Sequence, residues 1–162
     1  MKQLILVRHG KSSWEYEVGD KDRPLKQRGI NDGHIVSEKF SKKSPDIDAV
    51  YSSPANRALH TCIIFLRKLN IPFKDLLLTN ELYDFSGGMV MQFVHDLPDS
   101  LNTVMIFGHN HAFTEVANSL GDIMIDNVPT TGLVHLKFST NSWKSIEKGK
   151  TELCIFPKSL RG

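Results

Sequence analysis

The chain has 162 residues, 40% of them hydrophobic, which suits a single domain (residues 1–162) with a sizeable core. Its 20 Lys and Arg against 18 Asp and Glu give a formal net charge of +2 without a strongly basic region, which excludes nucleic acid as the expected partner. Two cysteines are too few for a disulfide framework. The sequence shows no signal-peptide pattern and no apolar run long enough to span a membrane, so we expect a cytoplasmic protein without a membrane partner.

Apolar runs that alternate with amphipathic stretches predict ten strands and helices. We expect them, in chain order, at residues 3–8 (strand), 26–41 (helix), 49–52 (strand), 55–69 (helix), 76–79 (strand), 88–97 (helix), 103–107 (strand), 112–121 (helix), 133–139 (strand) and 152–156 (strand). This alternation predicts an α/β fold of three layers around a doubly wound, mostly parallel sheet. The last two strands have no helix between them, which predicts an antiparallel edge.

Two of the predicted strands end in a histidine. The first runs through Leu4 and ends at Arg8 and His9, and a later one ends at Gly108 and His109. Short apolar runs without alternation are typical of strands buried on both faces, and open α/β sheets place ligand chemistry at the carboxyl ends of such strands. Two endings of this kind indicate a functional site rather than two unrelated polar turns.

A third strand end adds the features of an anion site. The strand at residues 49–52 leads into Ser53 and Pro54, and Arg57 falls in the first turn of the following helix. The free amides and positive dipole of a helix start favour an anion, and an arginine fork matches phosphate geometry. Ser12, in the loop after the first strand, could bind phosphate or serve as a turn or capping residue.

Four motifs occur in order along the chain: Arg8-His9-Gly10, Ser53-Pro54 with Arg57, Glu81-Leu82 and Gly108-His109-Asn110. Together they resemble the histidine phosphatase superfamily, whose fold is phosphoglycerate-mutase-like, and the resemblance covers almost the whole chain. It implies an enzyme in which His9 is phosphorylated and the phosphohistidine is then hydrolysed, while Arg8, Arg57 and His109 hold the phosphoryl group. Such chemistry depends on placement and charge stabilisation, with a neutral imidazole as the nucleophile.

The resemblance places the family's proton donor at Glu81. From the residues alone, Asp84 and a simple solvated turn carboxylate remain alternatives, since an acid role requires a raised pKa. A zinc cluster of His9, His109 and His111 is disfavoured, because no Asp or Cys stands at ligand spacing and the arginines repel a cation. We therefore expect a metal-independent enzyme that needs no cofactor.

The short intervals between the motifs narrow the class of substrate that we expect. Only 23 residues separate Arg57 from Glu81 and 27 separate Glu81 from His109, which leaves no room for a large lid domain. This short form resembles the SixA type of phosphohistidine phosphatase, and it implies a phosphorylated protein as substrate, such as a histidine phosphotransfer domain. The alternatives are a phosphatase acting on small phosphate esters and a phospho-binding module without turnover. Retention of both His9 and His109 favours an enzyme over the binding module.

Overall fold

The structure is a computed structural model that describes residues 1–161. Its main elements are β1 (Lys2–Arg8), α1 (Gln27–Ser41), β2 (Ala49–Ser52), α2 (Asn56–Leu69), β3 (Leu76–Leu78), α3 (Gly88–His95), β4 (Thr103–Gly108), α4 (Ala112–Leu120), β5 (Leu133–Phe138) and β6 (Lys150–Ile155). Every predicted helix and strand is present, with ends within two residues of the expectation. The structure also contains single turns of 3-10 helix that the sequence does not predict, including η1 (Asp20–Asp22) and η3 (Asn80–Leu82), because one turn is too short to produce a periodic pattern.

The strands form one sheet in the order β3-β2-β4-β1-β5-β6. The pairs β3–β2, β2–β4 and β4–β1 are parallel, and β5 is antiparallel to both β1 and β6. The observed sheet is therefore mostly parallel, with antiparallel pairing at its C-terminal strands, and it confirms the predicted α/β fold class.

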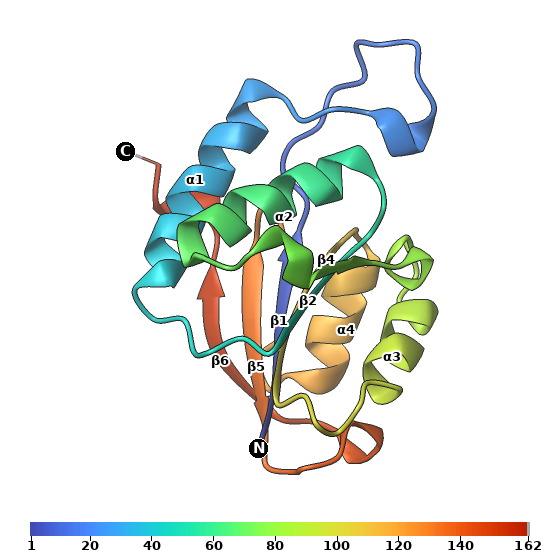
Figure 1. Ribbon diagram of the computed structural model, residues 1–162, viewed down its shortest axis with the longest axis vertical. Helices are drawn as coiled ribbons and strands as arrows, with labels where there is room; N and C mark the ends of the chain where they lie inside the picture. The colour runs from blue at the N-terminus through green and yellow to red at the C-terminus, as the bar shows by residue number, and fades with distance from the viewer. Residues whose placement is uncertain (162) are drawn as a thin grey trace.

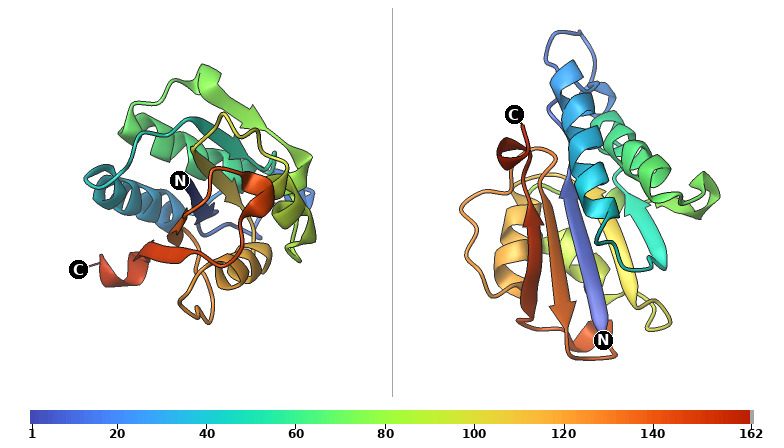
Figure 2. Two further views of the ribbon diagram at one scale, coloured as in Figure 1. Left: turned by 90° about the horizontal axis from the view of Figure 1, so that it is seen from below. Right: turned by 90° about the vertical axis from the view of Figure 1, so that its left-hand side faces the viewer.

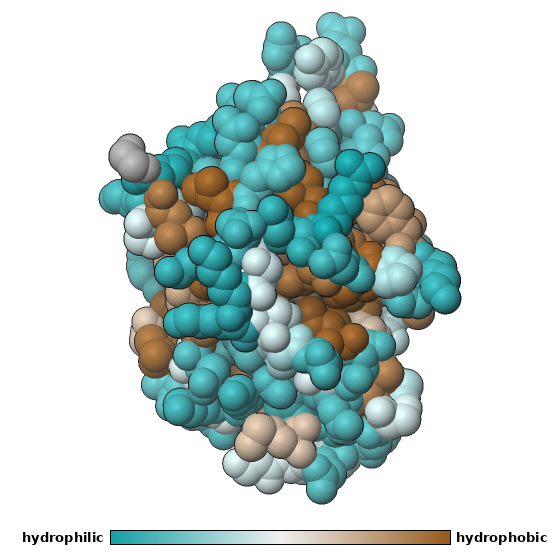
Figure 3. Space-filling view, turned by 60° about the vertical axis from the view of Figure 1, so that its left-hand side comes forward, coloured by the Kyte–Doolittle hydropathy of each residue, from teal (hydrophilic) through white to brown (hydrophobic). Residues whose placement is uncertain are grey.

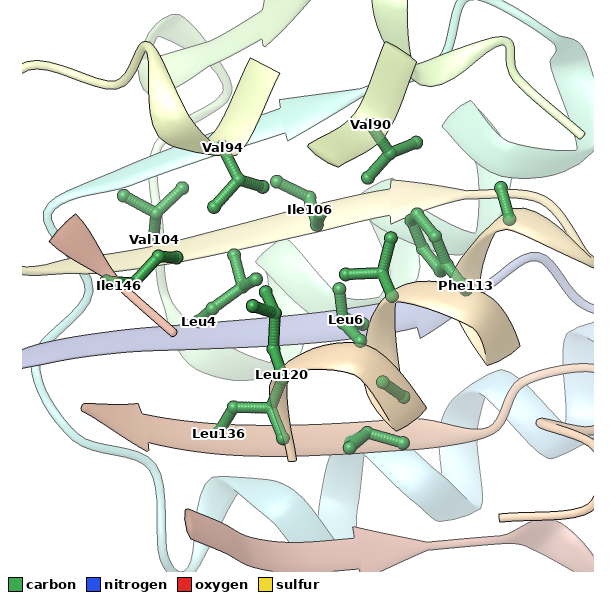
Figure 4. Close-up of a cluster of buried hydrophobic side chains, with 14 of the residues drawn as sticks. Leu4, Leu6, Val90, Val94, Val104, Ile106, Phe113, Leu120, Leu136 and Ile146 are labelled. Carbon is green, nitrogen blue, oxygen red and sulfur yellow. The ribbon is translucent and has the colours of Figure 1, made fainter. Parts of the chain in front are cut away.

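Helices cover both faces of this sheet (Figures 1 and 2). Alternate residues of β1 point to opposite faces, so Ile5 and Val7 pack with α1 and α2, whereas Leu4 and Leu6 pack with α3 and α4. Figure 4 shows the second of these clusters, in which Leu4 and Leu6 lie with side chains of α3, α4 and the neighbouring strands. Both faces of the central strands are thus buried, as the unbroken apolar runs predict.

Parallel pairing of β1 with β4 brings the two histidine-bearing strand ends together. Arg8 lies opposite Gly108 in the register, and the backbone N–H of His9 donates to the carbonyl of Gly108 at 3.0 Å. Gly108 has no room for a side chain, since a Cβ there would lie 2.7 Å from the ring of Phe113. The loop that follows β1 extends beyond this end of the sheet (Figure 1).

The start of α1 lies directly against the segment that follows His9. The backbone N–H of Lys26 donates to the carbonyl of Lys11 at 2.8 Å. A Cβ on Gly29 would lie 2.9 Å from the amide nitrogen of Lys11 and closer still to its carbonyl oxygen. The absence of a side chain at position 29 therefore lets α1 hold this loop in place.

We expect Gly29→Ala to destabilise the protein, because backbone atoms of Lys11 cannot move aside cheaply. Overpacking of this kind costs about 1–3 kcal/mol, which outweighs the roughly 1 kcal/mol that alanine gains over glycine in a helix. Thermal unfolding gives the measurement. Gly88→Ala is the matched control, because a Cβ at this first residue of α3 meets nothing within 4 Å. Equal melting temperatures for the two variants would contradict the prediction.

Candidate active site

His9 follows the last residue of β1 and is held in one tautomer. Its Nδ1 lies 2.7 Å from the carbonyl oxygen of Gly10. Because a carbonyl oxygen only accepts hydrogen bonds, Nδ1 carries the ring hydrogen and Nε2 keeps a free lone pair. Burial, and secondarily the charges of His109, Arg57 and Arg8, lower the pKa of His9 to about 3 despite its bond to Gly10. The ring is therefore neutral at neutral pH.

His109 is fully buried beside His9, with 5.2 Å between the two ring centroids. The rings of Tyr83 and Phe85 also pack on it, at 5.3 and 5.0 Å. Its Nε2 lies 2.8 Å from the hydroxyl oxygen of Ser53, which follows β2. Burial lowers the pKa of His109 to about 3, with a further contribution from Arg57. Both histidines of the site are thus neutral.

Two arginines approach the histidines, of which Arg57 is buried and Arg8 is half-buried. Arg57, in the first turn of α2, donates from Nη1 to the backbone carbonyl of Asp20 at 2.6 Å and from Nη2 to its carboxylate at 2.9 Å. Arg8 donates from Nη1 to the carbonyl of Val128 at 2.9 Å. These hydrogen bonds hold each arginine in place through one or two of its guanidinium nitrogens.

Unpaired buried polar atoms are concentrated at this site. Within residues 1–161, the buried side-chain nitrogen and oxygen atoms without a hydrogen-bond partner are Arg8 Nε, Arg57 Nε, His109 Nδ1 and Thr131 Oγ1. Thr131 belongs to the same place, because its backbone N–H donates to the carbonyls of Arg8 and His9 at 3.0 Å. Buried polar groups in proteins are normally paired, so this concentration indicates a site built for an acceptor-rich ligand, such as an anion.

The predicted residues Arg8, His9, Ser12 and Arg57 line one pocket of about 330 Å³. Its remaining lining residues are Lys11, Trp14, Asp20, Arg23, Phe85 and Thr130. His109 does not line this pocket and instead lies behind it in contact with the His9 ring. The structure thus brings together five of the six predicted site residues.

Glu81 is the sixth predicted residue, and it lies apart from the pocket. Its side chain is exposed on η3, where the carboxylate accepts a hydrogen bond from Thr79 Oγ1 at 3.3 Å. The alternative acid, Asp84, is buried and accepts hydrogen bonds from the backbone N–H groups of Val90, Ser86 and Gly87. Although burial raises the pKa of Asp84, these bonds lower it overall, so Asp84 stays ionised and serves to anchor the start of α3.

Asp20 is a residue of the pocket that the sequence did not predict. Its carboxylate accepts hydrogen bonds from Arg57, from Arg23 Nη1 at 3.0 Å and from the Tyr83 hydroxyl. Burial raises the pKa of Asp20, but these three donors hold it well below its usual range. Asp20 begins η1, a single turn in the loop between β1 and α1 that is too short to give a periodic signal in the sequence, and only the folded chain brings its three partners together.

Arg23 is a second residue of this loop whose role the sequence did not reveal. Besides its bond to Asp20, its Nη2 donates to the hydroxyl oxygen of Ser12, and its guanidinium carbon lies 3.4 Å from the ring centre of Trp14. Arg23 is 7% exposed and lines the pocket. It therefore adds a third arginine to the site and fixes the position of the Ser12 side chain.

A larger hollow of about 580 Å³ lies between α1 and α2, lined by residues such as Ile30, His60 and Ile63, but no predicted site residue lines it. Figure 3 shows the molecule from the side of these helices, with exposed apolar side chains among hydrophilic ones.

Residues 1–161 contain no group of three or more His, Cys, Asp and Glu side chains placed to hold a metal ion. No helix in this part of the chain is long and apolar enough to cross a membrane.

Comparison with known families agrees with the geometry. Residues 4–92 match the model of the histidine phosphatase superfamily (branch 1). The chain belongs to this superfamily. It is 26% identical over 160 residues to the uncharacterized protein Rv1276c of Mycobacterium tuberculosis, covering 93% of this chain and 98% of that protein. It is also 36% identical over 78 residues to a 2,3-bisphosphoglycerate-dependent phosphoglycerate mutase of Nautilia profundicola, but covers only 34% of the mutase.

The fold of the chain is similar to that of solved structures over nearly its whole length. The protein histidine phosphatase SixA in complex with tungstate superposes with a TM-score of 0.82 at 20% identity, covering 98% of this chain and 99% of SixA. A putative phosphohistidine phosphatase SixA from Agrobacterium tumefaciens gives 0.81 at 21% identity, with 96% and 98% of the two chains covered. The fold is therefore phosphoglycerate-mutase-like and is of the compact form that SixA adopts.

The low pKa values of the two histidines predict acid-sensitive stability. An unfolded histidine takes up a proton near pH 6.5, whereas His9 and His109 in the folded protein do so only near pH 3. Between these values the unfolded chain binds more protons, so the free energy of unfolding falls as pH falls, by about 1.4 kcal/mol per pH unit for each histidine. Urea unfolding between pH 7 and pH 5 measures this slope.

The histidine contribution is isolated by substitution. We expect His9→Asn to reduce the slope by about one proton, because it removes one group that titrates only in the unfolded chain. A His9→Asn variant with the wild-type slope would show that His9 does not titrate differently in the two states.

Proposed function

We propose that the protein is a metal-independent phosphatase that acts through a phosphohistidine intermediate on His9 and removes phosphate from phosphohistidine on a partner protein. The observation that carries the proposal is the His9 ring itself. It is neutral, its Nδ1–H is bound to Gly10, and its Nε2 lone pair is free beside two arginines and a second histidine. A free imidazole lone pair within a cluster of anion-binding groups is suited to attack on phosphorus.

The proposed reaction has two steps. His9 Nε2 attacks phosphorus, the bond from phosphorus to the substrate atom breaks, and that atom leaves with its electron pair and takes up a proton. Water then attacks the phosphoryl group on His9, which releases inorganic phosphate and restores the neutral ring. Arg8, Arg57 and the start of α2 stabilise the charge that spreads over the phosphoryl oxygens, so positive charge is available without a metal ion.

The acid groups of the pocket favour phosphohistidine over an alkyl phosphate. Among the described residues that line the pocket, the one carboxylate is Asp20, and its three hydrogen-bond donors keep it ionised. Glu81 is exposed outside the pocket. An alkoxide leaving group needs a proton donor, whereas imidazole is a better leaving group and needs less protonation. The likeness to SixA structures supports the same substrate class, with a histidine phosphotransfer domain as the proposed partner type.

Hydrolysis of a small phosphate ester is the second candidate. It is favoured by the sequence match to phosphoglycerate mutases and by the fold shared with the mycobacterial glucosyl-3-phosphoglycerate phosphatase Rv2419c, at a TM-score of 0.70 and 12% identity. In this case Glu81 would have to supply the proton, as in the role that the family resemblance gives it. Glu81 therefore separates the two candidates.

We expect His9→Ala to abolish phosphatase activity, because it removes the nucleophile. Rapid acid-free quenching of the wild-type reaction with a radiolabelled phosphoryl donor should trap acid-labile, base-stable phosphate on His9, located by peptide mapping. His60→Ala, which changes an exposed histidine of α2, should leave both activity and label intact. Label on His109, or turnover by His9→Ala, would disprove the assignment.

We expect Glu81→Gln to leave hydrolysis of a phosphohistidine protein within a few-fold of wild type. An alkyl phosphate should respond differently if Glu81 is its proton donor, because general acid catalysis is worth about 10²–10⁴-fold. The measurement is kcat/KM of both enzymes on both substrates. Equal large losses, together with a wild-type preference for the ester, would favour the small-molecule phosphatase instead.

A further inference from the structure

Ser53 lies at a position where its hydroxyl group can set the chemistry of His109. It follows β2, is fully buried, and is held by a bond from its backbone N–H to the carbonyl of Phe107 at 2.9 Å. Its Oγ accepts the backbone N–H of Ala55 at 3.2 Å and lies 2.8 Å from His109 Nε2. The side chain thus bridges the start of α2 and the second histidine.

The direction of the Ser53–His109 hydrogen bond follows from counting donors and acceptors. Ala55 already donates to the Ser53 oxygen, and the serine hydrogen still needs an acceptor. Within residues 1–161, the acceptor in reach is His109 Nε2. If His109 donated instead, both the buried hydroxyl hydrogen of Ser53 and the buried Nδ1 lone pair of His109 would be unpaired, whereas donation by the serine leaves only Nδ1–H without a partner. The serine therefore donates and Nε2 accepts.

We propose that Ser53 is a positioning residue that fixes His109 in the Nδ1–H tautomer, so that this ring presents an N–H donor to the phosphoryl group. The proposal rests on the proposed function for the identity of the ligand. Nδ1 of His109 is buried and has no partner among the described residues, so its hydrogen still needs an acceptor, and an oxygen atom of a ligand bound beside the His9 ring would supply one.

The same tautomer then serves opposite purposes in the two histidines. In His9, the Gly10 carbonyl binds Nδ1–H and leaves the Nε2 lone pair free for attack. In His109, the Ser53 hydroxyl occupies the Nε2 lone pair and leaves Nδ1–H free to donate. Because burial keeps both rings neutral, neither histidine can donate from both nitrogens, and the tautomer decides what each ring offers.

The experiment reads the tautomer directly. Protein labelled with ¹⁵N-histidine is studied at neutral pH by two-bond ¹H–¹⁵N correlation spectra, with His109 assigned from the His109→Gln variant. In the wild type we expect an unprotonated Nε2 and a protonated Nδ1. Ser53→Ala removes the hydroxyl donor and should shift His109 toward the Nε2–H tautomer.

Kinetics with para-nitrophenyl phosphate and binding of orthovanadate supply the functional readout. Loss of one preorganised donor to a developing oxyanion costs about 10²–10³-fold in kcat, and we expect Ser53→Ala to cost about 10- to 100-fold because the ring itself remains. The loss should fall mainly on kcat rather than KM, and orthovanadate should bind more weakly. Ser53→Thr keeps the hydroxyl and should retain the tautomer and recover most of the activity.

Ser52→Ala is the matched control. Ser52 is equally buried and adjacent in sequence, but its hydroxyl donates to the carbonyl of Ser53 and does not contact His109. It should keep the wild-type spectrum and kcat. A protonated Nε2 in the wild type, or an unchanged tautomer and kcat in Ser53→Ala, would overturn the inference. A protein with the expected tautomer but no phosphatase activity would instead overturn the proposed function.

Discussion

The register between β1 and β4 is the constraint on which the site depends. With Arg8 opposite Gly108, the residues that follow the two strands are His9 and His109, and their rings meet at 5.2 Å. A slip of one residue would move each side chain of β1 to the opposite face, where it would meet a different set of close-packed neighbours. The hydrophobic core therefore fixes the register, and the register places the two histidines.

The fold supplies a neutral pair of histidines among fixed cations. Burial is the largest cause of the low pKa of both rings, and the nearby arginines reinforce it. The arginines in turn are held by backbone carbonyls and by the Asp20 carboxylate, which lies on the loop after β1. Because the two imidazole rings stay neutral, they do not repel the arginines, which stay ionised. The position of the hydrogen on each ring is set by its neighbour, Gly10 for His9 and Ser53 for His109.

Strong local patterns made much of this molecule predictable. Apolar runs revealed the strands, and residues at strand ends revealed Arg8, His9 and His109, because parallel strands deliver such residues to one edge of a sheet. Arg57 was predicted from its place in the first turn of the helix that follows β2. The loop between β1 and α1 has no period, so the convergence of Asp20 and Arg23 on the pocket could not be anticipated. Glu81 shows the limit of motif order, since position along the chain does not determine whether a side chain enters a pocket or faces solvent.

The pairing of distant segments also has a consequence for how the protein acquires its site during synthesis. β1 emerges from the ribosome before its sheet neighbours β4 and β5, which begin at Thr103 and Leu133. Closing such long loops slows folding relative to local pairing, and the apolar β1 stays without its partners until β4 and β5 have been made. The histidine, arginine and serine side chains of the site come together only when the central strands pair, so a nascent chain that ends before β4 and His109 does not contain a complete site.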